Sequence, residues 1–299
     1  MDDSIYENYK RAGKIAAEAR EYGVSLLKPG VRLLDVATLI ENRITKNGAG
    51  LAFPVNIALN TLAAHYSPWH EDPMTFQKGD VVKLDVGAHI DGYIADTAVT
   101  IELDTHQYDT MIRASDEALK KVIDILTVHL PLSEAGKTIE GTITSFGYKP
   151  IENLMGHGLG RYELHSGVSI PNVGSLGEKT TLHEGDVVAI EPFATNGAGH
   201  VIAGNGSNIY LCKESIKAKL IRDNKIKVLS HKIWKQFGTL PFAQRWVHEL
   251  FPKDDLAMKK LSFLGVMKHY PQLVEAKGGI VTQKEHTVIV KEDGCEVIT

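Results

Sequence analysis

The chain has 299 residues and a formal net charge of −4; 43% of its residues are hydrophobic and 23% are charged. These proportions exclude a disordered or fibrous chain, and the acidic balance argues against a dedicated nucleic-acid binder. Two cysteines exclude a disulfide scaffold and are typical of a reducing compartment. The acidic start MDDSIYENYK lacks the apolar core of a signal peptide, and no apolar stretch is long enough to span a bilayer. We therefore expect a soluble cytoplasmic protein without membrane contact.

Two helices and a strand are predicted in the first part of the chain. Apolar residues within 5–26 follow helical spacing, and a second helix is predicted over 33–44, after the Pro29-Gly30 turn. The sequence GDVVKLD at 79–85 then reads as a turn followed by a largely apolar strand. This seven-residue motif ends on the carboxylate of Asp85.

The same plan recurs further along the chain. The sequence GDVVAIE at 185–191 is the counterpart of GDVVKLD, with Glu191 in the place of Asp85 (191 − 85 = 106). Two stretches of helical spacing, 118–125 and 139–146, precede it. An internal repeat of this kind predicts an α+β fold of two related halves about a pseudo-twofold axis. A site at that axis would receive one carboxylate from each half.

The segment 206–275 departs from the repeat. It is rich in lysine and apolar residues and reads mostly as helix, and the strand signal returns at 281–290. We therefore expect one catalytic domain over 1–299 that contains a helical insertion over 206–275. The lysines allow two interpretations, which are solvated helix faces or a contact with RNA or the ribosome.

A β-hairpin predicted over 80–102 brings two carboxylates together. If its turn is centred between Ile90 and Asp91, Asp85 lies directly opposite Asp96, with Cβ atoms roughly 4.5–5.5 Å apart. Two buried carboxylates at that distance need a cation or a shared proton. A pair of divalent metal ions meets this need, whereas the plain alternative is a pair of solvated strand carboxylates.

Three further residues are candidate metal ligands. Glu191 is the repeat counterpart of Asp85, His157 lies in the glycine-rich stretch LMGHGLG, and Glu285 lies in the predicted strand QKEHTVIV. A structural histidine and a surface glutamate are the alternatives for the last two. Four carboxylates and one imidazole suit two divalent ions such as Mn, Fe, Co or Zn. Such sites activate water at neutral pH.

Seven segments resemble the methionine aminopeptidases, in particular the type 2 branch and its archaeal members. They are spread along most of the chain and are NTLAAHYSP (60–68), KLDVGAHIDGYIADTA (83–98), NLMGHGLGRYELHSG (153–167), IPNVG (170–174), AIEPFATNGAG (189–199), GTLPFAQRW (238–246) and QKEHTVIV (283–290). The family has the pita-bread fold that creatinase and prolidase share, and a helical insertion is the hallmark of type 2. The resemblance therefore implies this fold here.

The resemblance also implies roles for particular residues. Five residues match the family's metal ligands, with Asp96 and Glu285 bridging the two ions: Asp85, Asp96, His157, Glu191 and Glu285. Two histidines match residues that meet the substrate: His65 would position it, and His165 would hydrogen-bond the scissile carbonyl or the tetrahedral intermediate. Phe53 and Tyr270 match side chains that line the methionine pocket.

The implied activity is removal of the N-terminal methionine from peptides and nascent chains, with a small second residue, by a hydroxide that bridges the metals. Glu191 would also shuttle a proton to the leaving amine. One alternative is an Xaa-Pro aminopeptidase or prolidase, which shares the five ligands but usually carries a further N-terminal domain. The other is a non-catalytic relative that binds RNA or protein, and the five intact ligands argue against it.

Overall fold

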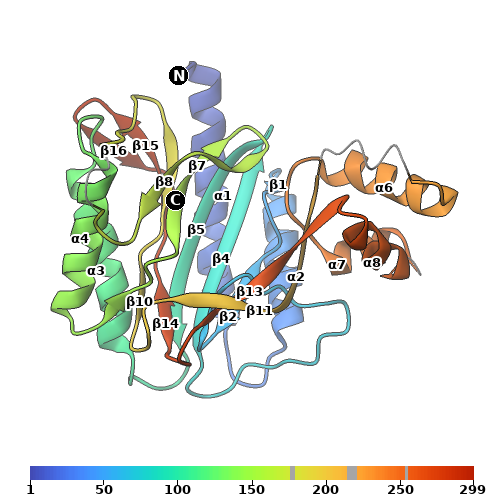
Figure 1. Ribbon diagram of the computed structural model, residues 1–299, viewed down its shortest axis with the longest axis horizontal. Helices are drawn as coiled ribbons and strands as arrows, with labels where there is room; N and C mark the ends of the chain where they lie inside the picture. The colour runs from blue at the N-terminus through green and yellow to red at the C-terminus, as the bar shows by residue number, and fades with distance from the viewer. Residues whose placement is uncertain (176–178, 214–220, 253–254) are drawn as a thin grey trace.

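The computed structural model describes residues 1–175, 179–213, 221–252 and 255–299 (Figure 1). The helices are α1 (Asp3–Leu26), α2 (Leu33–Lys46), α3 (Asp109–Ile125), α4 (Leu132–Ser145), α6 (Asn224–Phe237), α7 (Gln244–Leu250) and α8 (Asp255–Phe263). The strands are β1 (Gly50–Leu51), β2 (Asn56–Leu59), β3 (Leu62–Ala64), β4 (Val81–Ile90), β5 (Tyr93–Glu102), β6 (Lys149–Pro150), β7 (Met155–Gly160), β8 (Glu163–Pro171), β9 (Val187–Ile190), β10 (Phe193–Thr195), β11 (Val201–Cys212), β12 (Phe242–Ala243), β13 (Met267–Glu275), β14 (Val281–Gln283), β15 (His286–Lys291) and β16 (Gly294–Val297).

The four helices predicted from apolar spacing are confirmed. In α1 the side chain of Asp2 accepts a hydrogen bond from the backbone N–H of Ser4 at 2.9 Å and so caps the first turn. The apolar stripe that includes Ala12, Ala16 and Ala19 is fully buried. In Figure 1, α1 and α2 lie behind the hairpin β4–β5, and α3 and α4 pack together at the left.

Each half has its own hydrophobic core. One core joins α1 and α2 to the apolar face of β4, and the other joins α3 and α4 to β9 and β15. Strand β4 pairs with β1, β2 and β5, while β9 lies between β7 and β15 in a five-stranded sheet. Each half thus packs a helix pair on a sheet, as the repeat predicts.

The turns that begin the two repeated segments have the same hydrogen bonds. Gly79 and Gly185 have φ of 87° and 88°, which glycine adopts without a steric penalty. Asp80 Oδ2 accepts from the backbone N–H of Gln77 at 2.8 Å, and Asp186 Oδ2 accepts from that of His183 at 2.7 Å. The repeat predicted from GDVV is therefore a structural repeat.

The segment 206–275 is less helical than predicted. Its described helices are α6, α7 and α8, whereas its two ends are the strands β11 and β13, which pair antiparallel with each other. The apolar residues at these ends belong to a sheet that also includes β12 and β3. The helices project at the right of Figure 1 from this sheet. No described helix is long and apolar enough to cross a membrane.

Candidate metal centre and substrate pocket

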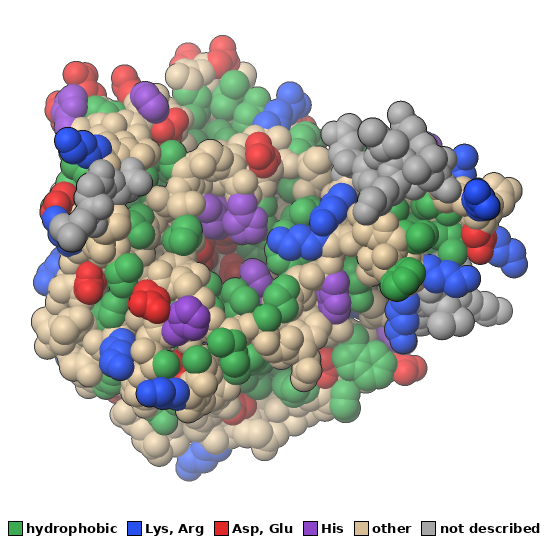
Figure 2. Space-filling model, in the orientation of Figure 1, with side chains coloured by type: hydrophobic (Ala, Val, Ile, Leu, Met, Phe, Trp, Pro, Cys, Tyr) green, Lys and Arg blue, Asp and Glu red, His purple; other side chains and the backbone are tan. Residues whose placement is uncertain are grey.

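One cavity gathers all nine residues that the sequence singles out. Histidine side chains surround a hollow in the middle of the face that Figure 2 shows. The cavity is lined by Phe53, His65, Asp85, Asp96, His157, His165, Glu191, Tyr270 and Glu285. It is also lined by five residues that sequence reasoning missed: Asn56, Ala64, Leu164, Ile209 and Pro241. These residues come from both halves and from the insertion.

The register of the hairpin β4–β5 differs from the prediction. The turn residues are Asp91 and Gly92, both with positive φ, so that Asp96 faces Gly87 and Asp85 faces Ala98. Asp85 and Asp96 are therefore diagonal neighbours and not a directly opposed pair. A shift of two positions leaves every side chain on its predicted face, because the side-chain period of a strand is two. Both carboxylates still line the cavity.

The second half supplies the remaining candidate ligands. His157 lies on β7 opposite Ala189 of β9, and Glu191 follows the end of β9. Glu285, between β14 and β15, exchanges backbone hydrogen bonds with Ala98 of β5 at 3.1 and 3.4 Å. This exchange joins the two halves at the cavity.

The four carboxyl groups are buried together, and this alters their titration. Burial raises the pKa of Asp85 to about 7, and a hydrogen bond with Asp96 lowers it in part. Burial, and then the charge of neighbouring carboxylates, raises the pKa values of Asp96 and Glu285 well above their usual range. The same causes raise the pKa of Glu191. Each group resists ionisation unless a cation is present.

The histidine at the same place favours its neutral form. Burial, and then His165, lowers the pKa of His157 to about 3. A neutral imidazole is the form that binds a metal ion. His157 Nε2 lies 3.7 Å from Asp96 Oδ2, and ligand atoms of Asp96, His157 and Glu285 lie within 4.8 Å of one another. These three side chains can therefore share an ion.

The residues present fit divalent metal ions. Asp85 Oδ1 and Asp96 Oδ1 are buried without a hydrogen-bond partner, which is costly for an acceptor that no cation neutralises. Four carboxylates and a neutral imidazole form a donor set that suits Mn, Fe, Co or Zn. Two divalent ions would balance the four negative charges.

Gln283 is a further residue of the site that the sequence analysis did not single out. Its Nε2 donates to Glu191 Oε2 at 3.1 Å and to Glu285 Oε2 at 3.4 Å. It precedes Glu285 by two positions, so strand alternation could have placed it on the same face. The amide fixes the orientation of both carboxylates.

An apolar wall closes the other side of the cavity. Tyr270 meets His65 edge to face, with ring centroids 5.3 Å apart. Phe53 packs on the backbone of β4, where a Cβ at Gly87 would collide with its ring. Ile209 and Pro241 complete the wall. Such a pocket can hold an apolar side chain next to the acidic cluster.

The two remaining histidines each contact another residue of the site, His165 beside His157 and His65 beside Tyr270. The ring centroids of His165 and His157 are 4.4 Å apart. Burial, and then Lys268, lowers the pKa of His165, so its imidazole is neutral near pH 7 and one ring nitrogen can donate a hydrogen bond. Burial, and then His165, lowers the pKa of His65 to about 4.

Known proteins are similar to this chain in sequence and in fold. A family model described as "Metallopeptidase family M24" matches residues 7–292. The chain belongs to metallopeptidase family M24. It is 47% identical over 301 residues to the methionine aminopeptidase of Methanocaldococcus jannaschii, with 100% of both chains covered. This relative confirms the resemblance to archaeal methionine aminopeptidases.

Solved structures with similar folds include a methionine aminopeptidase and a prolidase. A methionine aminopeptidase from Thermotoga maritima superposes with a TM-score of 0.73 and 25% identity, covering 100% of this chain and 98% of that one. The prolidase from Pyrococcus furiosus gives a TM-score of 0.63 and 19% identity, and the match covers 100% of this chain but 64% of that one. The predicted pita-bread fold is thus confirmed.

Proposed function

We propose that this metallopeptidase removes the N-terminal methionine from peptides and nascent chains, with preference for a small second residue. The observation that carries the proposal is the single cavity in which a buried acidic cluster meets an apolar wall. The cluster gives a place for catalytic metal ions, and the wall gives a place for one apolar side chain. An exopeptidase for N-terminal methionine needs both features side by side.

The acidic cluster would hold two divalent ions. The proposed ligands are Asp85, Asp96, His157, Glu191 and Glu285, with Asp96 and Glu285 as bridges. Bound divalent ions supply a water nucleophile at neutral pH and polarise the scissile carbonyl. Gln283 keeps two of the carboxylates oriented through its amide. Co, Mn, Fe and Zn all suit the ligand set.

The chain's own side chains would orient the substrate and move its protons. Phe53 and Tyr270 hold the methionine side chain, and His65, in edge contact with Tyr270, limits the space for the second residue. His165 donates a hydrogen bond to the carbonyl oxygen as negative charge develops there. Glu191 accepts a proton from the attacking water and passes it to the leaving amine.

The organisation of the chain follows from this assignment. We propose one catalytic domain over 1–299, with 206–275 as an insertion that contributes Ile209, Pro241 and Tyr270 to the cavity wall. The substrates are the N-termini of peptides. A contact of the lysine-rich insertion with the ribosome, and a cytoplasmic location, stay predictions.

Two peptides distinguish the proposed activity from that of a prolidase. Metal-stripped protein is incubated with Met-Ala-Ser or Ala-Pro-Ser while Mn, Fe, Co or Zn is added, and the released amino acid is measured. We expect metal-dependent release of methionine and no cleavage of Ala-Pro-Ser. Cleavage of only the proline peptide would assign the chain to the prolidase branch of the family.

A further inference from the structure

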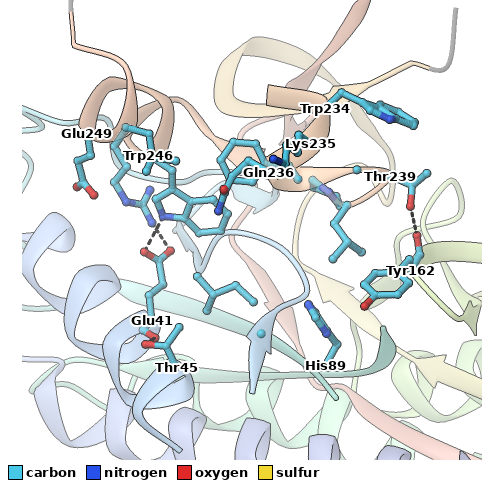
Figure 3. A pocket seen from close by; sticks show the side chains of 18 of the residues that line it. Glu41, Thr45, His89, Tyr162, Trp234, Lys235, Gln236, Thr239, Trp246 and Glu249 are labelled. Atoms are coloured by element: carbon cyan, nitrogen blue, oxygen red, sulfur yellow. Dashed lines mark hydrogen bonds and ion pairs between the residues drawn. The ribbon is translucent and has the colours of Figure 1, made fainter. Parts of the chain in front are cut away.

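In the segment 238–246, GTLPFAQRW, only Pro241 has been given a role so far, in the cavity wall. It forms the wall between the site cavity and a larger groove of about 860 Å³, which lies between α2 and the insertion helices α6 and α7 (Figure 3). Pro241 lines both the cavity and the groove. A movement of this segment therefore changes the shape of the cavity.

Arg245 anchors one end of the segment inside the protein. It is only 1% exposed, and its Nη1 donates to Ser67 Oγ at 2.7 Å and to the carbonyl of Pro68 at 2.8 Å. Its Nη2 donates to Glu41 of α2, whose other oxygen accepts from Trp246 Nε1 at 2.9 Å (Figure 3). A planar guanidinium can satisfy these three acceptors together, whereas a lysine ammonium cannot match their fixed geometry.

The two side chains that Arg245 holds fix the segment next to Phe53. Glu41 Oε1 accepts from the backbone N–H of Val55 at 3.2 Å. Ser67 Oγ donates to the carbonyl of the same residue at 2.9 Å. Both backbone polar groups of Val55 are thus held by partners of Arg245, two positions after Phe53.

Arg245, Glu41 and Ser67 form a buried polar cluster, and Ser67 connects this cluster to the segments that carry His65 and Tyr270. The backbone N–H of Ser67, two positions after His65, donates to the carbonyl of Ser207 at 3.1 Å. The hydroxyl of Ser207 donates to the carbonyl of Tyr270 at 2.7 Å. Ser67 and Ser207 are both fully buried, so water does not compete for these bonds.

The other end of the segment is tied to the hairpin that carries the site histidines. Thr239 Oγ1 donates to the carbonyl of Tyr162, which lies in the turn between β7 and β8 (Figure 3). His157 and His165 lie on these two strands. The wall at Pro241 is therefore fixed at both ends.

We propose that Arg245 is a positioning residue that sets the width of the methionine pocket. It holds the segments that carry Phe53, His65 and Tyr270 against the wall at Pro241, without touching substrate or the reacting atoms. The inference rests on the proposed methionine specificity. It predicts that Arg245 controls which N-terminal side chain is accepted, while the acidic cluster and His165 keep their positions.

Two conservative variants test the inference, since one keeps the charge of residue 245 and the other removes only a hydroxyl group. Arg245→Lys and Ser67→Ala are compared with the matched control Glu249→Gln, which alters an exposed residue of the same helix. For the first two we expect a KM for Met-Ala-Ser raised about 10-fold and a kcat within about 3-fold of wild type. The ratio of kcat/KM for Met-Ala-Ser over Leu-Ala-Ser should fall about 10-fold. Metal stoichiometry and the control variant should match wild type.

The selectivity ratio separates positioning from general destabilisation. A merely unstable variant has a smaller active fraction, which lowers both kcat/KM values equally and leaves their ratio unchanged. A wild-type ratio and KM in both variants would therefore overturn the inference while the proposed function stands. Hydrogen exchange of peptides covering 53–58 and 64–68 gives a readout that needs no activity. Faster exchange there in both variants supports the inference, and unchanged exchange overturns it even if the wild type releases no methionine.

Discussion

His157 Nε2 lies 3.7 Å from Asp96 Oδ2, and this approach joins the two halves of the molecule at one point. Asp96 belongs to β5 of the first half and His157 to β7 of the second. The repeat thus produces a composite site, in which the three side chains that can share an ion, Asp96, His157 and Glu285, come from both halves.

Replacing Asp96 with asparagine tests the bridging assignment. The amide keeps the size of the side chain but loses its charge, so the binding of both ions should weaken by more than about 100-fold, since supporting residues alone are worth 10–100-fold. Native mass spectrometry of metal-loaded protein counts the ions per chain. Loss of one ion with retention of the other would show that Asp96 serves a single metal.

Replacing His165 with alanine tests its role at the carbonyl oxygen. A lost oxyanion donor should lower kcat by about 10²–10³. The number of bound ions should not change, because His165 is not among the proposed ligands. His129→Ala, at an exposed histidine, is the matched control. Undiminished turnover in the His165 variant would remove this residue from the mechanism.

Replacing Gln283 with alanine tests whether its amide positions two of the ligands. Without the donor to Glu191 and Glu285, the carboxylates lose a fixed orientation, and metal affinity should fall about 10–100-fold. Calorimetric titration of metal-stripped protein measures this directly. An unchanged affinity would mean that the hydrogen bonds seen here do not matter for the loaded site.

The stability of the metal-free protein should depend on the protonation of Asp85. Burial raises the pKa of Asp85 to about 7 in the folded chain, against 3.8 ordinarily. The stabilisation that the protonated carboxyl gives the folded chain is therefore fully present below about pH 4 and is lost as the pH rises through 7. At pH 8, metal-free Asp85→Asn should therefore melt several degrees above metal-free wild type, and at pH 4 the two should agree. A lower melting temperature of the variant at pH 8 would contradict the expectation that the ionised, buried Asp85 destabilises the metal-free protein.

Added metal should reverse that trend. Divalent ions bind the ionised carboxylates, so the rise in melting temperature on adding Mn to the wild type should grow between pH 4 and pH 7. Differential scanning fluorimetry at matched pH values measures this difference. A stabilisation that does not vary with pH would indicate that the ions bind elsewhere.

Much of the fold and the site could be predicted from the sequence because each copy of the repeat independently supports the interpretation of the other. GDVVKLD and GDVVAIE begin with the same turn, and Asp85 and Glu191 each follow the glycine of that turn at the same distance along the chain. Residue alternation along a strand places Asp85 and Asp96 on one face in any register shifted by an even number of positions. The predicted pairing was wrong, yet the predicted face was right for this reason. The Asp91-Gly92 dipeptide is a strong turn signal that gives the correct register.

The rest of the site depends on contacts between distant segments. Ile209 and Pro241 reach the cavity because β11 and β12 belong to one sheet with β3, and no local pattern predicts that sheet. The strands at the two ends of the insertion contain a single lysine, Lys268, so the lysine-rich composition that favoured helix belongs to the residues between them. The cluster of Arg245, Glu41 and Ser67 likewise joins three segments that only the folded chain brings together.

The proposed function requires that this cavity release methionine only through the ions it holds. The most direct test treats the protein with a chelator, restores one metal in steps, and measures bound ions and methionine release from Met-Ala-Ser in the same samples. We expect the bound ions and the methionine release to disappear together with the chelator and to return together. Full methionine release by a chain that holds no ions would contradict it.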